Sequence, residues 1–156
     1  MSTGKPLLTT LARLVHLAIR KRLVADLQTA GFDDLTPAYL YVFQLPGPDG
    51  LRPGELAARM NMTKQATNHL LKSLEARGYL ERTAVPRDGR AKVLRLTPRG
   101  RQVAKIMQDS SRRLEEEWAE RLGRQTLEHL REELTEIVSL TSVNASEALP
   151  DRASGS

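Results

Sequence analysis

The sequence contains no cysteine, and aromatic residues make up only 4% of its 156 residues. Without thiols, the chain can form neither disulfides nor thiolate metal sites, and it cannot sense oxidants through a cysteine. No hydrophobic run approaches the roughly 20 apolar residues that a helix needs to cross a bilayer. No signal peptide is recognisable. We therefore expect a cytoplasmic protein with no membrane partner.

Motifs that usually carry catalysis are also missing. The sequence has no glycine-rich phosphate loop and no pattern that pairs a nucleophile with a base. His16, His69 and His129 are too scattered to suggest a metal site. We expect no enzymatic activity, no cofactor and no bound metal.

Positive charge, in contrast, is concentrated in one third of the chain. Residues 51–100 contain 11 Lys/Arg and 4 Asp/Glu, so their balance is 11 − 4 = +7. The whole chain has a net charge of +5, which leaves 5 − 7 = −2 for the remainder. A basic segment within a slightly acidic protein is typical of molecules that bind a nucleic-acid backbone.

Within this basic segment, the sequence predicts two helices separated by a tight turn. The first runs from Pro53 to Met60, and proline suits a first helical position. The second runs from Thr63 to Arg77, with the Thr63 side chain as its N-cap. Gly78 is placed to end this helix in a left-handed conformation.

A β-hairpin is predicted to follow, with strands at Tyr79–Ala84 and Ala91–Leu96 and Asp88-Gly89 at its tip. Two helices followed by a basic hairpin indicate a winged helix-turn-helix, which we assign to residues 36–97. The second helix of such a module enters the DNA major groove.

Longer helices are predicted on both sides of the module, at Leu7–Gln28, Pro98–Leu122 and Gln125–Thr141. A shorter helix is expected at Pro37–Gln44. The fold class is thus mainly α with a small β-hairpin wing. Because the long helices carry leucine stripes that the module does not need, we assign 7–30 and 98–143 to a dimerisation region. A monomeric helical bundle is the alternative. Residues 144–156 are expected to be a disordered tail.

Several motifs resemble the MarR family of bacterial transcription regulators. They are L-R-P-G-E-L-A at 51–57, L-E-A-R-G-Y-L-E-R at 74–82, P-R-D-G-R-A-K at 86–92 and L-T-P-R-G at 96–100. The resemblance covers about residues 7–141. It implies a homodimer that reads a palindromic operator in double-stranded DNA, acting as a repressor that a small aromatic or anionic effector relieves. A winged-helix scaffold or docking module without sequence-specific readout is the alternative function.

The wing departs from the family pattern at one position. Family wings often read Asp-Pro-x-Asp-x-Arg, and here Val85 replaces the first acid, while Asp88 and Arg90 match. The resemblance implies that these two residues stabilise the wing or set its approach to the minor groove. We expect Arg87 to contact DNA and Arg90 to be partly structural, through a pair with Asp88.

The second helix supplies the expected base contacts. We predict that Ala66, Leu70, Leu71 and Leu74 face the core, which turns the polar side chains outward. Gln65, Asn68 and His69 are assigned to base edges. The remaining DNA-facing residues are Thr63, Lys64, Thr67 and Lys72, of which Thr63, Lys64 and Lys72 are assigned mainly to phosphates.

The resemblance also implies an effector site between the dimer helices and the DNA reader. The matching region would be lined by His16, Tyr39, Phe43 and Met107. From the residues alone, a lone histidine on a helix is more often packed or exposed than a ligand contact, and a Tyr/Phe cluster is more often hydrophobic core.

Overall fold

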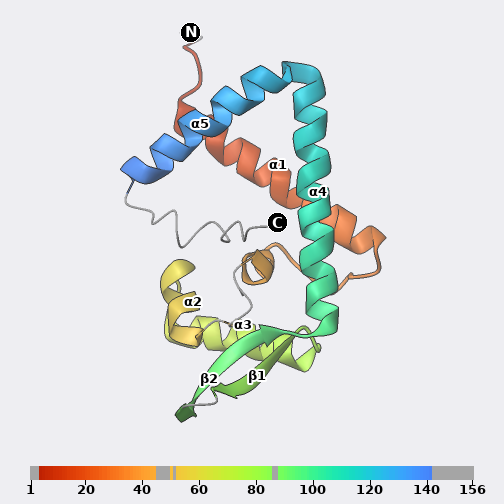
Figure 1. The fold of residues 1–156 in the computed structure, drawn as a ribbon, viewed down its shortest axis with the longest axis vertical. Helices are drawn as coiled ribbons and strands as arrows, with labels where there is room; N and C mark the ends of the chain where they lie inside the picture. The colour runs from red at the N-terminus through yellow and green to blue at the C-terminus, as the bar shows by residue number, and fades with distance from the viewer. Residues whose placement is uncertain (1–3, 45–49, 51, 86–87, 142–156) are drawn as a thin grey trace, which may run out of the picture.

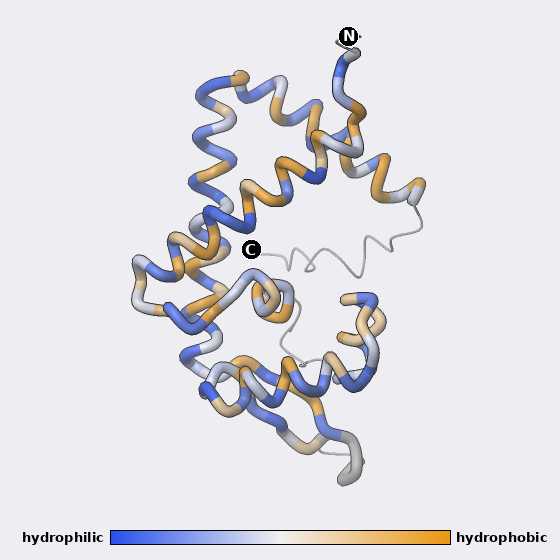
Figure 2. The backbone as a smooth tube through the Cα atoms, turned by 180° about the vertical axis from the view of Figure 1, so that it is seen from behind, coloured by the Kyte–Doolittle hydropathy of each residue, from blue (hydrophilic) through white to orange (hydrophobic). Residues whose placement is uncertain are grey.

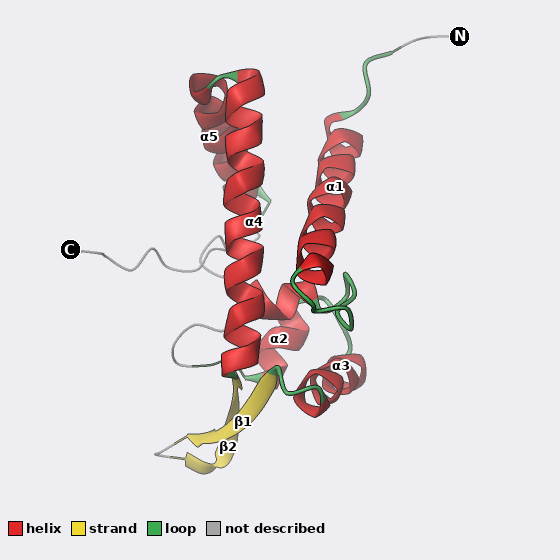
Figure 3. Cartoon of the chain, turned by 90° about the vertical axis from the view of Figure 1, so that its right-hand side faces the viewer, coloured by secondary structure: helices red, strands yellow, loops and turns green. Residues whose placement is uncertain are grey.

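A computed structural model describes residues 4–44, 50, 52–85 and 88–141, with the side chains of 85 and 88–91 left undescribed. The winged helix-turn-helix, called the reader below, forms one end of the molecule with its short helices and hairpin, and long helices rise from it (Figure 1). In the side view of Figure 3, α1 and α4 stand as two columns above the reader, with α5 beside α4. The predicted fold class, mainly α with a β-hairpin wing, is confirmed.

The order of elements follows the sequence prediction. The helices are α1 (Leu8–Thr29), the 3-10 helix η1 (Leu40–Gln44), α2 (Pro53–Arg59), α3 (Lys64–Ala76), α4 (Pro98–Leu122) and α5 (Arg124–Leu140). The strands are β1 (Leu80–Val85) and β2 (Asp88–Leu96), which pair antiparallel. Among the described residues, no helix is long and apolar enough to cross a membrane. The predicted disordered tail at 144–156 lies outside the described residues.

The predicted α-helix at Pro37–Gln44 is wrong in type. The segment begins with turns, and only Leu40–Gln44 is helical, in the 3-10 form. Its backbone bonds join residues three apart, such as Val42 N to Tyr39 O at 3.1 Å. Short 3-10 segments are common connectors, and this one is held by burial of Leu40, Val42 and Phe43 rather than by its own length.

The hairpin forms as predicted, but Asp88-Gly89 does not form its tip. Strand β2 already begins at Asp88, which pairs with Val85, so residues 86 and 87 connect the strands. The register then jumps to Ala84 opposite Lys92, which leaves three residues of β2 in a bulge. Glycine suits a bulge as well as a turn, and the Asp-Gly pair was therefore ambiguous between the two.

One apolar core joins the reader to the long helices. Leu23 and Leu27 come from the second half of α1, while Val103 and Met107 come from the first half of α4. They pack with the other buried members of the cluster: Phe32, Leu35, Leu40, Val42, Phe43, Leu56, Leu70, Leu71, Leu74, Tyr79, Leu80 and Leu94. The other halves of α1 and α4, and all of α5, project away from this core (Figure 1).

Above the core, α1 and α4 are joined by a polar network around Asp26. Its carboxylate accepts hydrogen bonds from the buried Ser110 hydroxyl, from Arg113 at 3.1 Å and from Arg22 at 3.3 Å. Arg22 also pairs with Glu117 at 3.0 Å. Burial alone would raise the pKa of Asp26, but the bonds from Ser110 and Arg113 and the charges of Arg22 and Arg113 outweigh it, so the pKa is lowered.

This network predicts an acid-sensitive contribution to stability. A carboxyl with a lowered folded pKa stabilises the protein above its unfolded pKa of about 3.9, and the contribution is lost as pH falls through the folded value. We expect Asp26→Asn to lower the free energy of unfolding at pH 7 by about 1.5–3 kcal/mol, as for other hydrogen bonds to charged groups. The deficit relative to wild type should shrink below about pH 4.

Urea titrations at pH 7 and pH 3, at one fixed protein concentration, measure this difference. Asp109→Asn is the matched control, because Asp109 makes an i,i+4 pair with Lys105 on the surface of α4, and such pairs add little. A deficit for Asp26→Asn that is equal at both pH values would contradict the assignment.

Candidate nucleic-acid interface

Helix α3 begins and ends as the sequence predicts. The Thr63 hydroxyl accepts a hydrogen bond from Ala66 N at 3.1 Å, which confirms it as the N-cap. The turn before it contains Asn61 with a φ of 49°, a conformation that asparagine tolerates better than most residues. After the helix, Gly78 has a φ of 77°, the left-handed stop that only glycine adopts freely.

Four polar side chains of α3 form one exposed stripe. Gln65, Asn68, His69 and Lys72 are spaced at i, i+3, i+4 and i+7 and are all exposed. At about 100° per residue, they fall within an arc of roughly 100°. Their spacing is thus the same as that of a buried stripe, but on the opposite side of the helix.

The buried side of α3 corrects one prediction. Thr67, expected to face outward, is only 1% exposed, and Ala66, expected in the core, is exposed. Thr67 lies at i relative to Leu70, Leu71 and Leu74 at i+3, i+4 and i+7, so the helical period puts it at the centre of the buried arc. The prediction placed these two residues by the polarity of their side chains, whereas the helical period gives their positions correctly. A side chain so buried has no access to DNA, and Thr67 leaves the set of candidate contacts.

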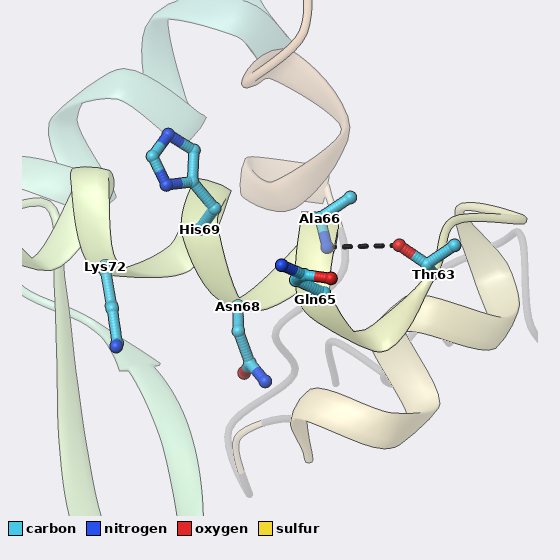
Figure 4. A pocket seen from close by; sticks show the side chains of 6 residues that line it. All are labelled: Thr63, Gln65, Ala66, Asn68, His69 and Lys72. Atoms are coloured by element: carbon cyan, nitrogen blue, oxygen red, sulfur yellow. Dashed lines mark hydrogen bonds between the residues drawn. The ribbon is translucent and has the colours of Figure 1, made fainter.

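The exposed stripe lines an open hollow in the surface of the reader. The hollow has a volume of about 830 Å³, and its lining consists of Thr63, Gln65, Ala66, Asn68, His69 and Lys72. Figure 4 shows these side chains along one run of α3, with Asn68 and Lys72 extending the same way from the helix. The hollow is lined by amides, an imidazole and an ammonium group, which can pair with base edges and phosphates.

An ion pair links α3 to the wing. Glu75, near the end of α3, pairs with Arg82 on β1 at 2.8 Å. Arg95 on β2 donates to the Thr83 hydroxyl on β1 at 3.2 Å, which ties the two strands together. The sequence did not predict the Glu75–Arg82 contact. The two residues lie on different elements, and the chain reverses direction between them at Gly78, so neither the helical nor the strand period relates their positions.

Three lysines of α3 and the hairpin are exposed, and one of them, Lys72, lines the hollow. Lys64 and Lys72 on α3 and Lys92 on β2 are exposed, and within the described part of the chain none of them forms an ion pair. Arg87 lies outside the described residues, and Arg90 lies on β2 with an undescribed side chain. The predicted Asp88–Arg90 pair therefore stays a prediction, as does the effect of Val85.

The four residues expected at an effector site do not form one group. Phe43 and Met107 belong to the apolar core, and Tyr39 packs against it with its hydroxyl 3.2 Å from Ser73 Oγ. His16 is exposed on α1 and lies outside this cluster. Tyr39, Phe43 and Met107 thus lie in or against the core of the single chain, and the effector site between two chains stays a prediction.

Comparisons with known proteins agree with this geometry. A profile of the MarR family matches residues 33–91, which hold the whole helix-turn-helix and most of the hairpin. The exopolysaccharide II synthesis transcriptional activator ExpG of Rhizobium meliloti is 34% identical over 96 residues. That match covers 60% of this chain and half the length of ExpG.

Solved structures extend the similarity to nearly the whole chain. The MarR family protein Rv2887 of Mycobacterium tuberculosis, in complex with salicylic acid, is 28% identical, with a TM-score of 0.64 over 88% of this chain and 99% of that one. The transcriptional repressor CouR, bound to a 23-mer DNA duplex, is 26% identical, with a TM-score of 0.68 over 88% and 98%.

The match to the family profile is confined to the region of the helix-turn-helix and the wing, whereas the fold agrees with these regulators over nearly the whole chain. The chain resembles the MarR family of transcription regulators in its helix-turn-helix sequence and in its fold.

Proposed function

We propose that this regulator is a homodimer that reads an inverted repeat in double-stranded DNA through α3. The observation that carries the proposal is the exposed stripe of Gln65, Asn68, His69 and Lys72 along the open hollow. Gln65 and Asn68 present amides that can pair bidentately with adenine, and His69 adds a further base-edge contact. Thr63, Lys64 and Lys72 face phosphates, with Arg87 and Arg90 acting from the wing.

Dimerisation is supported by the long helices, which keep much of their apolar surface exposed. Helix α5 buries none of its residues in the single chain. Large apolar side chains are exposed along α1 and α5 and at the end of α4: Leu7, Leu8, Leu11, Leu14, Val15, Leu17, Leu122, Leu130, Leu134, Ile137 and Leu140. Figure 2 shows the hydrophobic positions recurring along these helices. Exposed apolar side chains in this number are typical of an interface, and a second copy of α1 and α5 would cover them.

Selection of bound duplexes from a random pool at physiological salt tests the readout. We expect wild type to enrich an inverted repeat with half-sites about one turn, roughly 34–36 Å, apart. Asn68→Ala should lose the preference at one position in each half-site, by roughly 5- to 150-fold for a bidentate pair worth about 1–3 kcal/mol. Lys72→Ala is the matched control, and it should weaken binding to all sequences alike and lower the salt dependence.

Enrichment of no repeat, with weak salt dependence, would favour a winged-helix docking module instead. A loss for Asn68→Ala that is equal on selected and random duplexes would show that Asn68 reads no base.

Substitution on α5 tests the dimer. Leu134 is 47% exposed in the single chain, and the dimer should bury it. Leu134→Glu would then place an unpaired charge in the interface, at a large desolvation cost. The molar mass measured by light scattering should be twice the chain mass of 17.4 kDa for wild type and equal to one chain mass for the variant. Glu132→Lys, on the opposite face of α5, should remain dimeric. A dimeric Leu134→Glu variant would exclude this face from the interface.

We further propose that the bound dimer represses transcription from a promoter that overlaps its operator, in the cytoplasm, and that a small aromatic anion relieves it. The relative crystallised with salicylic acid supports an effector of this chemistry, and the DNA-bound relative is a repressor. ExpG, in contrast, is an activator. Because Phe43 and Met107 are buried, an effector that touches them has to open the core between η1 and α4.

Transcription in vitro from a template carrying the selected operator tests both parts. We expect the protein to reduce transcript yield and millimolar salicylate to restore it, while benzyl alcohol, which lacks the charge, restores less. Increased yield on adding the protein would assign activation instead. If sodium chloride at the same ionic strength restores the transcript as well as salicylate does, salicylate acts only by screening the phosphate contacts and is not an effector.

A further inference from the structure

Tyr79 stands where three parts of the molecule meet. It follows the glycine that ends α3 and precedes β1, and it is 0% exposed. Its ring packs edge-on against Phe43 with centroids 5.7 Å apart, and tilted against Phe32 at 6.2 Å. Phe32 and Phe43 both belong to the connection between α1 and α2. The end of α3 is thus embedded in that connection.

The Tyr79 hydroxyl makes two directional bonds within this packing. It donates to Asp34 Oδ1 at 2.5 Å and accepts from Arg99 Nη2, on the first turn of α4, at 3.0 Å. The Arg99 guanidinium also lies 4.7 Å from the Tyr79 ring centroid and 5.4 Å from that of Phe32. Burial and the bond to Asp34 raise the pKa of Tyr79 despite the opposing effect of Arg99. The hydroxyl therefore keeps its proton and can donate.

Contacts to the backbone of Gly78 and Tyr79 also hold the start of α4 against the end of α3. Thr97 N donates to Tyr79 O at 3.1 Å, and the Thr97 hydroxyl donates to Gly78 O at 2.6 Å. A Cβ added to Gly100 would lie 2.2 Å from Tyr79 O, so only glycine permits this approach. The base of α4 consequently has no room to slide along the end of α3.

The last turn of α3 is held from the other side as well. Arg77 donates to the Asp34 carbonyl at 2.5 Å, and its guanidinium lies 5.1 Å from the Tyr39 ring centroid. Asp34 therefore binds α3 through its carbonyl and Tyr79 through its carboxylate. None of these groups belongs to the exposed stripe that faces DNA.

We propose that Tyr79, with Asp34 and Arg99, is a positioning joint that sets the angle of α3 against α1 and α4, and thereby the half-site spacing that the dimer accepts. The inference rests on the proposed function, because spacing has meaning only for a dimer reading two half-sites. Burial of apolar surface is non-directional, whereas two hydrogen bonds on one hydroxyl fix a direction.

Spacing is a sensitive measure of such a joint. One inserted base pair moves a half-site by about 3.4 Å along the duplex and turns it by about 35° around the axis. A rigidly held pair of readers cannot follow both displacements, so binding weakens steeply. A loosened joint allows each reader to follow its half-site.

The test uses the full-length protein and the selected operator, with one or two base pairs inserted or deleted between the half-sites. Binding is measured by fluorescence anisotropy. We expect wild type to lose at least tenfold in affinity for each altered spacing. Tyr79→Phe, which keeps the ring and removes only the hydroxyl, should reduce this loss to threefold or less. Its preference among bases within each half-site should equal that of wild type.

Four further variants separate the joint from general stability. Asp34 is exposed, so Asp34→Ala removes the acceptor without opening the core, and it should relax spacing as Tyr79→Phe does. Asp34→Asn keeps an oxygen acceptor and should retain the wild-type spacing preference. Tyr41→Phe is the matched hydroxyl control, because its hydroxyl makes one long bond of 3.4 Å to Arg59 O on α2. Asn68→Ala should show the reverse pattern, with lost base preference and unchanged spacing.

Each outcome has a separate meaning. A spacing penalty in Tyr79→Phe and Asp34→Ala equal to that of wild type would overturn the joint. So would a uniform loss of affinity on every duplex, which is what partial unfolding gives. If wild type itself selects no inverted repeat, the proposed function fails first, and that failure is visible before any variant is made.

Discussion

Burial of Leu70, Leu71 and Leu74 fixes how α3 is rotated about its own axis, and the rest of the interface depends on that rotation. With these leucines in the core, the helical period leaves Gln65, Asn68, His69 and Lys72 on the opposite side. A rotation by one residue, about 100°, would replace this set with another. The core therefore selects the side chains that can meet DNA, even though no core residue touches it. The same burial takes in Thr67, whose hydroxyl finds no partner among the described residues.

Helix α1 divides its apolar stripe between two environments. Its second half places Leu23 and Leu27 in the core of the single chain, whereas its first half leaves Leu11, Leu14 and Val15 exposed. Helix α4 is divided in the same way, with its first half in the core, and α5 contributes nothing to that core. The stripe on α1 thus runs from the core of the single chain to the proposed dimer interface, and an unbroken helix rather than a linker joins the reader to that interface. The Asp26 network joins the second half of α1 to the middle of α4.

Most of the fold was predictable from the sequence, because its signals are local. Thr63 and Thr97 before their helices, Gly78 after α3 and the period of the long helices all act over a few residues. The exposed stripe was also predictable, apart from the exchange of Ala66 and Thr67. The 3-10 form of η1 and the bulge in β2 were not, because tertiary burial and strand register decide them. Contacts such as Tyr79 to Asp34 and Asp26 to Ser110 join residues 45 and 84 positions apart, and no sequence period reaches that far.

The length of α4 gives the molecule mechanical leverage. Its 25 residues span about 37 Å at 1.5 Å per residue. A tilt of about 5° at one end of such a rod displaces the other by about 3 Å, close to the rise of one base pair. Small adjustments at the proposed dimer interface, far from the reader, would therefore be converted into shifts of a whole base step at the DNA. Helix α4 would thus act as a rigid lever between the proposed dimer interface and the reader.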